Sequence, residues 1–331
     1  MLRLGLGLLQ EYPPDQLVQI VRTTEEAGYH TFWYGNEKYF RDMYIGLALA
    51  AMSSRHLQLG TFIADPYTAH PALTAVSVAT LDELSHGRAI LLLGAGGGGG
   101  TGLGYTRTKP ARAIRESIHV IRGLLTGERV TFAGEVVRFS NGKLDFPSRA
   151  DLPIYVASRG DLVLSMAAEV ADGVMIATYA TPVGVQHALA RIDLGLRKSG
   201  RTRSDIRLIS RVDAWIDRDR SKAREAVRPM VARLMTTSYP DTSFVSAVGV
   251  DIPPVLREVL AQKDRALATR SGHLVTDELL DAFTWAGTAE EVAERAQSIA
   301  TQGIDDITVT LHPPPGEPVE PAIRSFAEAM R

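Results

Sequence analysis

The sequence predicts an α/β fold, namely a single (β/α)8 TIM barrel that spans residues 1–331. Two observations support this prediction. Short apolar runs alternate with amphipathic segments along the whole chain, and eight of these runs are each followed by a segment with helical spacing. An open doubly wound sheet with an extra domain is the alternative. Because the alternation continues to the C-terminus and no linker interrupts it, the barrel is favoured.

Composition excludes several classes of protein. The chain has 331 residues, of which 45% are hydrophobic and 22% charged, as in ordinary globular proteins. It contains no cysteine, which excludes disulfides, thiolate metal sites and cysteine nucleophiles. The formal charge of −2 gives no general reason to expect a nucleic acid or membrane partner. The N-terminus lacks the long apolar run of a signal peptide, so we expect a cytoplasmic protein.

The predicted strands are short, apolar and bounded by glycine, proline or polar residues, as expected for buried parallel strands. They cover residues 4–9, 31–35, 57–64, 89–95, 153–157, 174–178, 206–216 and 306–311. The predicted helices begin at proline or at polar residues, and Thr288 with Glu291 forms a capping-box pattern. They cover residues 15–27, 44–52, 71–84, 110–125, 162–171, 183–198, 221–235, 288–301 and 321–330.

Two stretches break this rhythm and are predicted to be insertions. Residues 130–146 alternate apolar with polar side chains and contain turn pairs at Ala133-Gly134 and Asn141-Gly142, which predicts a small β-hairpin. Residues 236–281 are predicted to be mostly helical and irregular.

The loop after the second strand carries charged residues where barrel enzymes hold their active sites. In one interpretation Glu37 is a proton donor or acceptor near the reacting centre. In the other, the loop is solvated and contains an Arg41–Asp42 or Lys38–Asp42 ion pair. Position alone leaves both interpretations open.

The loop after the fourth strand is rich in glycine from Gly94 to Gly104. Without side chains, its backbone N–H groups can approach a flat or anionic ligand, and we favour such a role over a loop without a ligand. A dinucleotide fingerprint is excluded because residues 105–109 separate the glycines from the helix that begins at Pro110. The end of the third strand, between Gly60 and Pro66, fits an ordinary buried strand that ends in a turn.

The fifth strand leads into Ala157, Ser158, Arg159 and Gly160 at the start of a helix. Exposed N–H groups, a hydroxyl and a guanidinium there would suit a phosphate. Ser158 or Asp161 acting only as a helix cap is the equal alternative. The eight histidines show no ligand spacing of a helical zinc site, so we predict no metal, and we expect Trp33 to be a core residue.

A set of short motifs runs through nearly the whole chain. It consists of Trp33-Tyr34-Gly35-Asn36-Glu37 with Arg41-Asp42, Leu59-Gly60-Thr61 with Asp65-Pro66-Tyr67-Thr68 and His70-Pro71, Thr80-Leu81-Asp82-Glu83-Leu84-Ser85 with Gly87-Arg88-Ala89, Gly94-Ala95-Gly96-Gly97, Lys109-Pro110, Pro153-Ile154-Tyr155, Ala171-Asp172-Gly173, and Ala286-Gly287-Thr288 with Glu290-Glu291-Val292. With these motifs the chain resembles the luciferase-like superfamily of flavin and coenzyme F420 oxidoreductases. Within it, the likeness is to the F420-dependent branch of methylenetetrahydromethanopterin reductases and their bacterial relatives.

The resemblance implies an enzyme that transfers a hydride between reduced F420 and a C=C, C=N or C=O bond of a small organic substrate. FMN-dependent monooxygenase chemistry is the alternative, and a cofactor-free barrel is a further one. The resemblance also implies a homodimer. The resemblance also shows one departure: several relatives have an Asp-His pair where this chain has Asn36-Glu37. A carboxyl group, rather than a histidine, would therefore transfer the proton here.

The resemblance also places the cofactor. It puts the ring near Asn36, Thr61, Phe62 and Ile63, and it implies a non-proline cis peptide bond between Phe62 and Ile63. It puts the side chain and phosphate along three further segments, which consist of Gly94, Ala95, Gly96, Gly97 and Gly98, of Ala157, Ser158, Arg159 and Gly160, and of Ala177, Thr178 and Tyr179.

Overall fold

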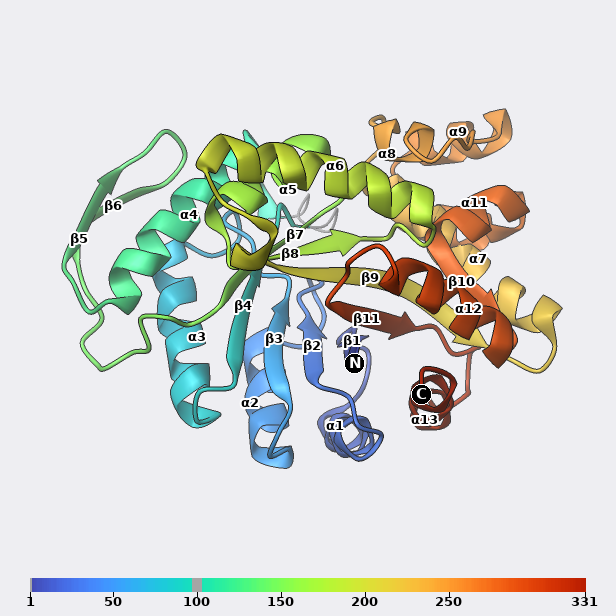
Figure 1. Cartoon of the computed structure of the whole chain (residues 1–331), viewed down its shortest axis with the longest axis horizontal. Helices are drawn as coiled ribbons and strands as arrows, with labels where there is room; N and C mark the ends of the chain where they lie inside the picture. Colours follow the sequence, from blue (N-terminus) through green and yellow to red (C-terminus); the bar gives the residue numbers. More distant parts are fainter. Residues whose placement is uncertain (1, 97–102) are drawn as a thin grey trace. The chain divides into compact units, whose positions relative to one another are not determined.

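A computed structural model describes residues 2–96 and 103–331. All eight predicted strands are present, and a closed barrel of parallel strands alternates with helices (Figure 1). The sheet order is β10-β9-β11-β1-β2-β3-β4-β7-β8, and a further β9–β8 pairing closes it. The barrel strands are β1 (Arg3–Leu8), β2 (Thr31–Gly35), β3 (Gln58–Phe62), β4 (Ala89–Leu93), β7 (Ile154–Ser158), β8 (Gly173–Ala177), β9 (Arg207–Ile216) and β11 (Asp306–Leu311).

The nine predicted helices are also present, with ends that differ by at most one residue. Proline occupies the first turn of several of them, where its missing N–H costs nothing. The capping box of Thr288 and Glu291 is formed as predicted. These helices are α1 (Pro14–Glu26), α2 (Met43–Ser53), α3 (Pro71–Leu84), α4 (Pro110–Leu125), α5 (Asp161–Val170), α6 (Pro182–Ser199), α7 (Arg220–Thr236), α12 (Ala289–Ala300) and α13 (Glu320–Ala329).

The two insertions have the predicted character. The first is an antiparallel hairpin of β5 (Val130–Ala133) and β6 (Arg138–Gly142). The second contains four short helices, α8 (Ser243–Ser246), α9 (Pro254–Ala261), α10 (Arg265–Arg270) and α11 (Asp277–Phe283). The sequence analysis missed one element, strand β10 (Thr284–Gly287), which pairs in parallel with the second half of β9. It joins α11 directly to the cap of α12, so its four residues show no pattern of their own.

The chain divides into two compact units, each described by itself below. The first unit consists of Gly5–Met175 and Arg191–Arg207, and the second of Met1–Leu4, Ile176–Ala190 and Leu208–Arg331. We call them the N-terminal unit and the C-terminal unit. One continuous domain over residues 1–331 stays a prediction.

Trp33 lies in the core of the N-terminal unit, as expected, with 1% of its surface exposed. Its strand partners are Gly7 on β1 and Gly60 on β3. A Cβ at Gly60 would lie 2.0 Å from the Trp33 ring, so glycine is required there. This packing fixes β2 against β3 just below the loops that follow both strands.

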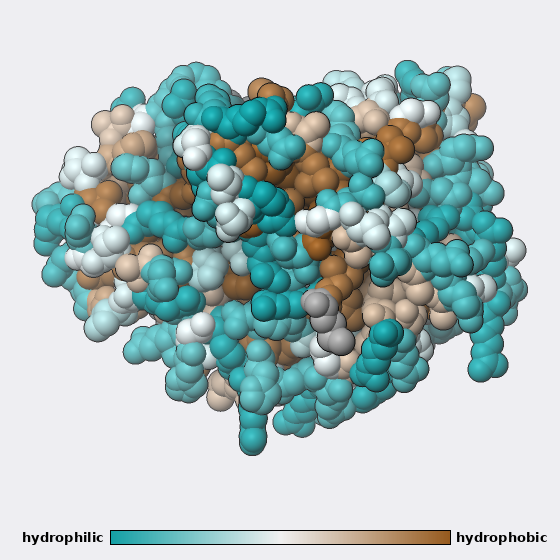
Figure 2. Space-filling view, in the orientation of Figure 1, coloured by the Kyte–Doolittle hydropathy of each residue, from teal (hydrophilic) through white to brown (hydrophobic). Residues whose placement is uncertain are grey.

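Hydrophilic residues cover most of the face of the protein seen in Figure 2. Among the described residues, no helix combines the length and the hydropathy that crossing a membrane requires.

Candidate active site

The loop after β2 is fixed to two neighbouring strands by side-chain hydrogen bonds. The Asn36 amide donates to the Ile63 carbonyl at 3.0 Å, directly beyond β3. The backbone N–H of Glu37 donates to the side-chain oxygen of Gln10, beyond β1, at 2.7 Å. The half-buried Glu37 therefore stands on a loop held at both sides, which is what a positioned proton-transfer group needs.

The peptide bond between Phe62 and Ile63 is cis, as the resemblance implied. Both residues are partly exposed at the carboxyl end of β3. The buried Thr61 hydroxyl donates to the Leu92 carbonyl at 2.9 Å and accepts from the Leu92 N–H at 2.8 Å, so it joins β3 to β4. The chain beyond the cis bond stays attached to β4, because the Gly94 N–H donates to the Ala64 carbonyl at 3.0 Å.

Gly94 and Gly96 begin the glycine-rich loop and pack against the end of β3. A Cβ at Gly94 would lie 2.3 Å from the Ile63 side chain. Gly96 has a φ of +76°, and its carbonyl accepts from Arg107 at 2.8 Å. Gly97 and Gly98 lie outside the described residues. A side chain at Gly94 would therefore displace the Ile63 side chain at the strand end that the resemblance assigns to the cofactor ring.

Lys38 pairs with Asp65, so both ion pairs expected within the loop were wrong. The Lys38 ammonium lies 2.9 Å from the Asp65 carboxylate, which is 1% exposed. Asp42 instead caps α2 by accepting from the Ile45 N–H, and Arg41 donates to backbone carbonyls. Burial alone would raise the pKa of Asp65, but hydrogen bonds from Lys38 and Thr68 outweigh it and lower the pKa. Asp65 is therefore a fixed anion.

The cofactor that the resemblance implies can be tested against this strand end. Asn36, Lys38 and Asp65 line a cavity of about 300 Å³ together with residues from the start of α2 and α3. Phe62 and Ile63 do not line this cavity, and they present a partly exposed apolar surface at the end of β3. A deazaflavin ring, which is flat, fits this apolar surface.

Ser158 and its neighbours lie at the carboxyl end of β7, where they are partly or fully exposed. The Ser158 hydroxyl accepts from the Gly160 N–H at 3.0 Å, and Asp161 pairs with Arg191 at 2.8 Å. Gly160, the residue that precedes α5, makes no side-chain cap bond. The side-chain helix cap of the alternative interpretation is not formed, and the phosphate site stays a prediction.

Ala177, Thr178 and Tyr179 belong to the C-terminal unit. Thr178 has a φ of +71°, and its N–H donates to the Arg211 carbonyl of β9 at 2.9 Å. The Tyr179 ring is fully buried and packs against His187 and Phe283. A ligand at this segment would therefore meet backbone rather than the Tyr179 ring.

Sequence reasoning missed a buried polar cluster on the neighbouring strands. Arg211 makes two hydrogen bonds of 2.6 Å to the Asp213 carboxylate, and the same carboxylate lies 2.7 Å from Nε2 of His312. Asp213 has no exposed surface. An arginine and an aspartate two residues apart inside an otherwise apolar strand were a usable signal, because buried charges must be paired.

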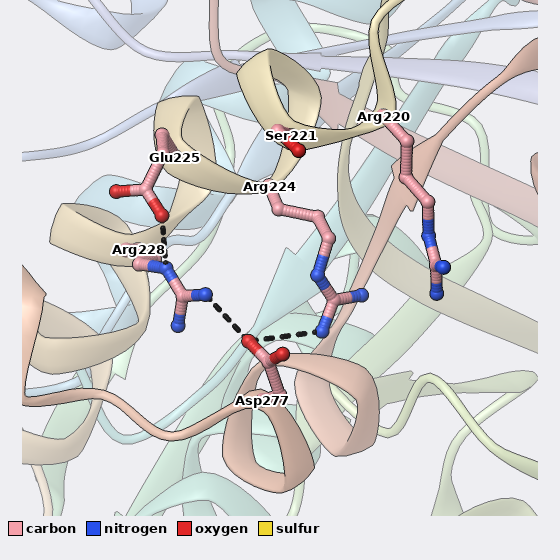
Figure 3. A pocket seen from close by; sticks show the side chains of 6 residues that line it. All are labelled: Arg220, Ser221, Arg224, Glu225, Arg228 and Asp277. Atoms are coloured by element: carbon pink, nitrogen blue, oxygen red, sulfur yellow. Dashed lines mark hydrogen bonds and ion pairs between the residues drawn. The ribbon is translucent and has the colours of Figure 1, made fainter.

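A second polar pocket in the C-terminal unit, of about 240 Å³, lies between α7 and α11 (Figure 3). Arg224 and Arg228 both point toward Asp277, and Glu225 points toward Arg228. Within the described residues, no group of three or more His, Cys, Asp or Glu side chains is placed to hold a metal ion.

Comparison with known proteins gives consistent matches. The sequence model of the family described as luciferase-like monooxygenase matches residues 2–306. The chain is 32% identical over 320 residues to the 5,10-methylenetetrahydromethanopterin reductase of Archaeoglobus fulgidus, covering 94% of this chain and 93% of that protein. It is 31% identical over 321 residues to the reductase of the same name from Methanolobus tindarius, covering 96% and 94%. The solved structure of the coenzyme F420-dependent tetrahydromethanopterin reductase from Methanopyrus kandleri superposes with a TM-score of 0.87 at 26% identity, covering 99% of this chain and 98% of that one.

Proposed function

The chain belongs to the luciferase-like monooxygenase family, and on this basis we propose that it transfers a hydride between coenzyme F420 and a C=N, C=C or C=O bond of a small organic substrate. It is an F420-dependent oxidoreductase of that family. When bound, F420 supplies the hydride-carrying carbon, and the protein supplies position and electrostatics. A substrate whose reducible carbon is bonded to nitrogen comes first, because the relatives named above are 5,10-methylenetetrahydromethanopterin reductases.

The observation that carries the proposal is the end of β3. The Asn36 amide donates to the Ile63 carbonyl on one side of this strand end, and the Gly94 N–H donates to the Ala64 carbonyl on the other. These residues would support one face of the ring and leave the other face to the substrate. Gly94, Ala95 and Gly96, with Ala157, Ser158, Arg159 and Gly160, would hold the rest of the cofactor within the same unit.

Glu37 is the proposed proton-transfer residue of this loop. It follows β2 directly, and its backbone is anchored to Gln10. A carboxyl there can hold the proton that accompanies the hydride.

Cofactor choice is tested by titrating the purified protein with F420 and with FMN, followed by fluorescence quenching. We expect clearly tighter binding of F420. Equal or reversed affinities would favour the FMN-dependent monooxygenase, and no binding of either would favour a cofactor-free barrel. Turnover is then measured with reduced F420 and 5,10-methylenetetrahydromethanopterin.

A homodimer and a cytoplasmic location complete the proposal. The outer faces of α2 and α3 expose apolar side chains, and Met52 and Leu84 line a groove of about 520 Å³ between these helices. The exposed apolar residues are Ile45, Met52, Leu73, Val76 and Leu84. A second copy of this chain would cover this face. Sedimentation of the wild type and of Ile45→Lys tests it, and a monomeric wild type would contradict it.

A further inference from the structure

Gln10 is a buried polar residue to which the proposed function gives no task. It lies just beyond β1, and only 1% of its surface is exposed. Its side-chain oxygen accepts from the Glu37 N–H at 2.7 Å, and its side-chain nitrogen donates to the Arg41 carbonyl at 2.7 Å. A buried amide needs partners for both its oxygen and its nitrogen. Gln10 finds both in a single loop, the one that follows β2.

The loop from Glu37 to Arg41 is clamped at both ends by these two hydrogen bonds. The Arg41 guanidinium returns the contact by donating to the Gln10 carbonyl at 3.2 Å. Inside the loop, the Phe40 N–H donates to the Glu37 carbonyl at 3.4 Å, and Tyr39 has a φ of +69°. A residue other than glycine keeps such a φ only where the surrounding contacts hold it. The clamp of Gln10 supplies contacts of this kind at the two ends of the loop.

Glycine at position 35 leaves the room that the Gln10 side chain needs. Strands β1 and β2 pair in parallel with Leu8 opposite Tyr34, so the chain beyond each strand end lies beside the other. A Cβ on Gly35 would lie 3.1 Å from the Gln10 side-chain oxygen and 3.2 Å from the Leu8 carbonyl. Both distances are shorter than ordinary van der Waals contacts, so a side chain at this position would displace Gln10.

Glu37 lies between two residues whose side chains are bonded elsewhere. Asn36 and Lys38 bond through their side chains to the chain beyond β3. Glu37 is bonded to Gln10 through its backbone N–H, so this bond does not occupy its carboxyl group. All of these residues belong to the N-terminal unit. The clamp therefore fixes the backbone of Glu37 and leaves the carboxyl for chemistry.

We propose that Gln10 is a positioning residue for the hydride-transfer reaction, because it fixes the place of Glu37 by holding both ends of its loop. This proposal rests on the proposed function, in which Glu37 transfers the proton. A proton-transfer group has to come within about 2.6–3.2 Å of the atom that gains or loses the proton, so a shift of the loop slows the chemical step. Gln10 itself is buried, and its effect on the reaction passes through Glu37.

The first experiment needs neither cofactor nor substrate. Methionine is about as long as glutamine but has no amide, so Gln10→Met removes the clamp and nearly keeps the volume. Protein labelled with ¹⁵N-glutamate reports the Glu37 N–H by NMR, and the Glu37→Gln spectrum identifies its signal. We expect this N–H to exchange with solvent about 10-fold faster or more in Gln10→Met, as the loss of one ordinary hydrogen bond implies. Unchanged exchange would overturn the proposal.

The second experiment uses reduced F420 and 5,10-methylenetetrahydromethanopterin. Gln10→Met should lower kcat by about 10- to 100-fold, as expected when a reacting group moves by about 1 Å, with KM and F420 affinity nearly unchanged. In the Glu37→Gln background the same substitution should have little further effect, because the carboxyl that Gln10 positions is already absent. A loss that multiplies fully with that of Glu37→Gln would show that Gln10 acts elsewhere, and it would overturn the proposal.

Two further variants separate positioning from a general loss of structure. Gln19 is exposed on α1, and Gln19→Met is the matched control that should leave exchange and kcat unchanged. Gly35→Ala displaces Gln10 without removing it, so it should lower kcat by a smaller factor, and only where Glu37 is present. Thermal unfolding shows whether each variant is folded. If Gln10→Met does not fold, Gly35→Ala decides the question by the same comparison.

The two proposals fail in different ways. A wild-type protein that does not bind F420 would contradict the proposed function, and the exchange experiment would still show whether Gln10 clamps the loop. A protein that binds F420 and turns over, but keeps its kcat in Gln10→Met, would contradict only the role of Gln10.

Discussion

Asp65 in the N-terminal unit and Asp213 in the C-terminal unit are both buried carboxylates near the carboxyl ends of barrel strands, and each is paired with a cation. The remaining hydrogen bonds of Asp65 come from the N–H groups of Tyr67 and Thr68 and from the Thr68 hydroxyl, all in the adjacent turn. Those of Asp213 include one from a partly exposed imidazole 99 residues away in the sequence. The difference separates a carboxylate that holds its own loop from one that orients a side chain far away in the sequence.

Removal of the cation should have the largest effect at Asp65. In Lys38→Met the buried carboxylate loses its charged partner, which typically costs about 3–5 kcal/mol of unfolding free energy. Urea denaturation measures this loss. The double variant Lys38→Met/Asp65→Asn should recover part of it, because the amide oxygen can still accept from the turn. A loss below about 1 kcal/mol would mean that water reaches Asp65.

Arg211→Met should cost less than Lys38→Met, because the hydrogen bond between Asp213 and His312 remains in the variant. Urea denaturation of the two variants measures the difference in unfolding free energy. An equal cost would remove the difference between the two regions.

Glu37→Gln tests whether the loop that the Lys38–Asp65 pair holds carries a proton-transfer residue. We expect turnover to fall by at least about 100-fold with little change in cofactor affinity, because glutamine keeps the shape but cannot carry the proton. Steady-state kinetics and F420 titration measure the two quantities. Wild-type turnover would return Glu37 to an ordinary solvated loop.

Both carboxylates should make the unfolding free energy fall at low pH. Because folding lowers the pKa of Asp65 and of Asp213, each contribution is complete above the unfolded value of about 3.9 and is lost as pH falls through the lower folded value. Unfolding free energy should therefore drop below about pH 4. In Lys38→Met the pKa of Asp65 is no longer held down, so the contribution of Asp65 to this drop should shrink, which a denaturation series from pH 6 to 3 would detect.

The fold was predictable because its signals are local. Apolar runs such as Ala89–Leu93 end at glycine, and helices such as α3 start at proline, so each element is defined by neighbours in the sequence. Strand β10 was not predictable, since it has four residues between a helix and a cap. The pairs of side chains were not predictable, because the fold brings together residues that are distant in the sequence. Lys38 and Asp65 are 27 residues apart, and Asp213 and His312 are 99 residues apart. The cis bond between Phe62 and Ile63 followed from the resemblance alone, because its residues fit an ordinary strand.

The ion pairs of Arg224 and Arg228 with Asp277 (Figure 3) are exposed, in contrast to the two buried pairs. We expect the smallest loss of unfolding free energy when they are removed. Asp277 is 61% exposed, although it pairs with Arg224 and Arg228. Water and salt screen such pairs, and both arginines keep other partners, Asp281 and Glu225, when Asp277 is neutralised. Asp277→Asn should therefore lower the unfolding free energy by at most about 1 kcal/mol, and the loss should shrink further in 1 M salt, whereas the loss in Lys38→Met should persist there. If Asp277→Asn lost as much unfolding free energy as Lys38→Met, burial would not explain the difference between these ion pairs. The number of charged groups in each network would then be the property to compare.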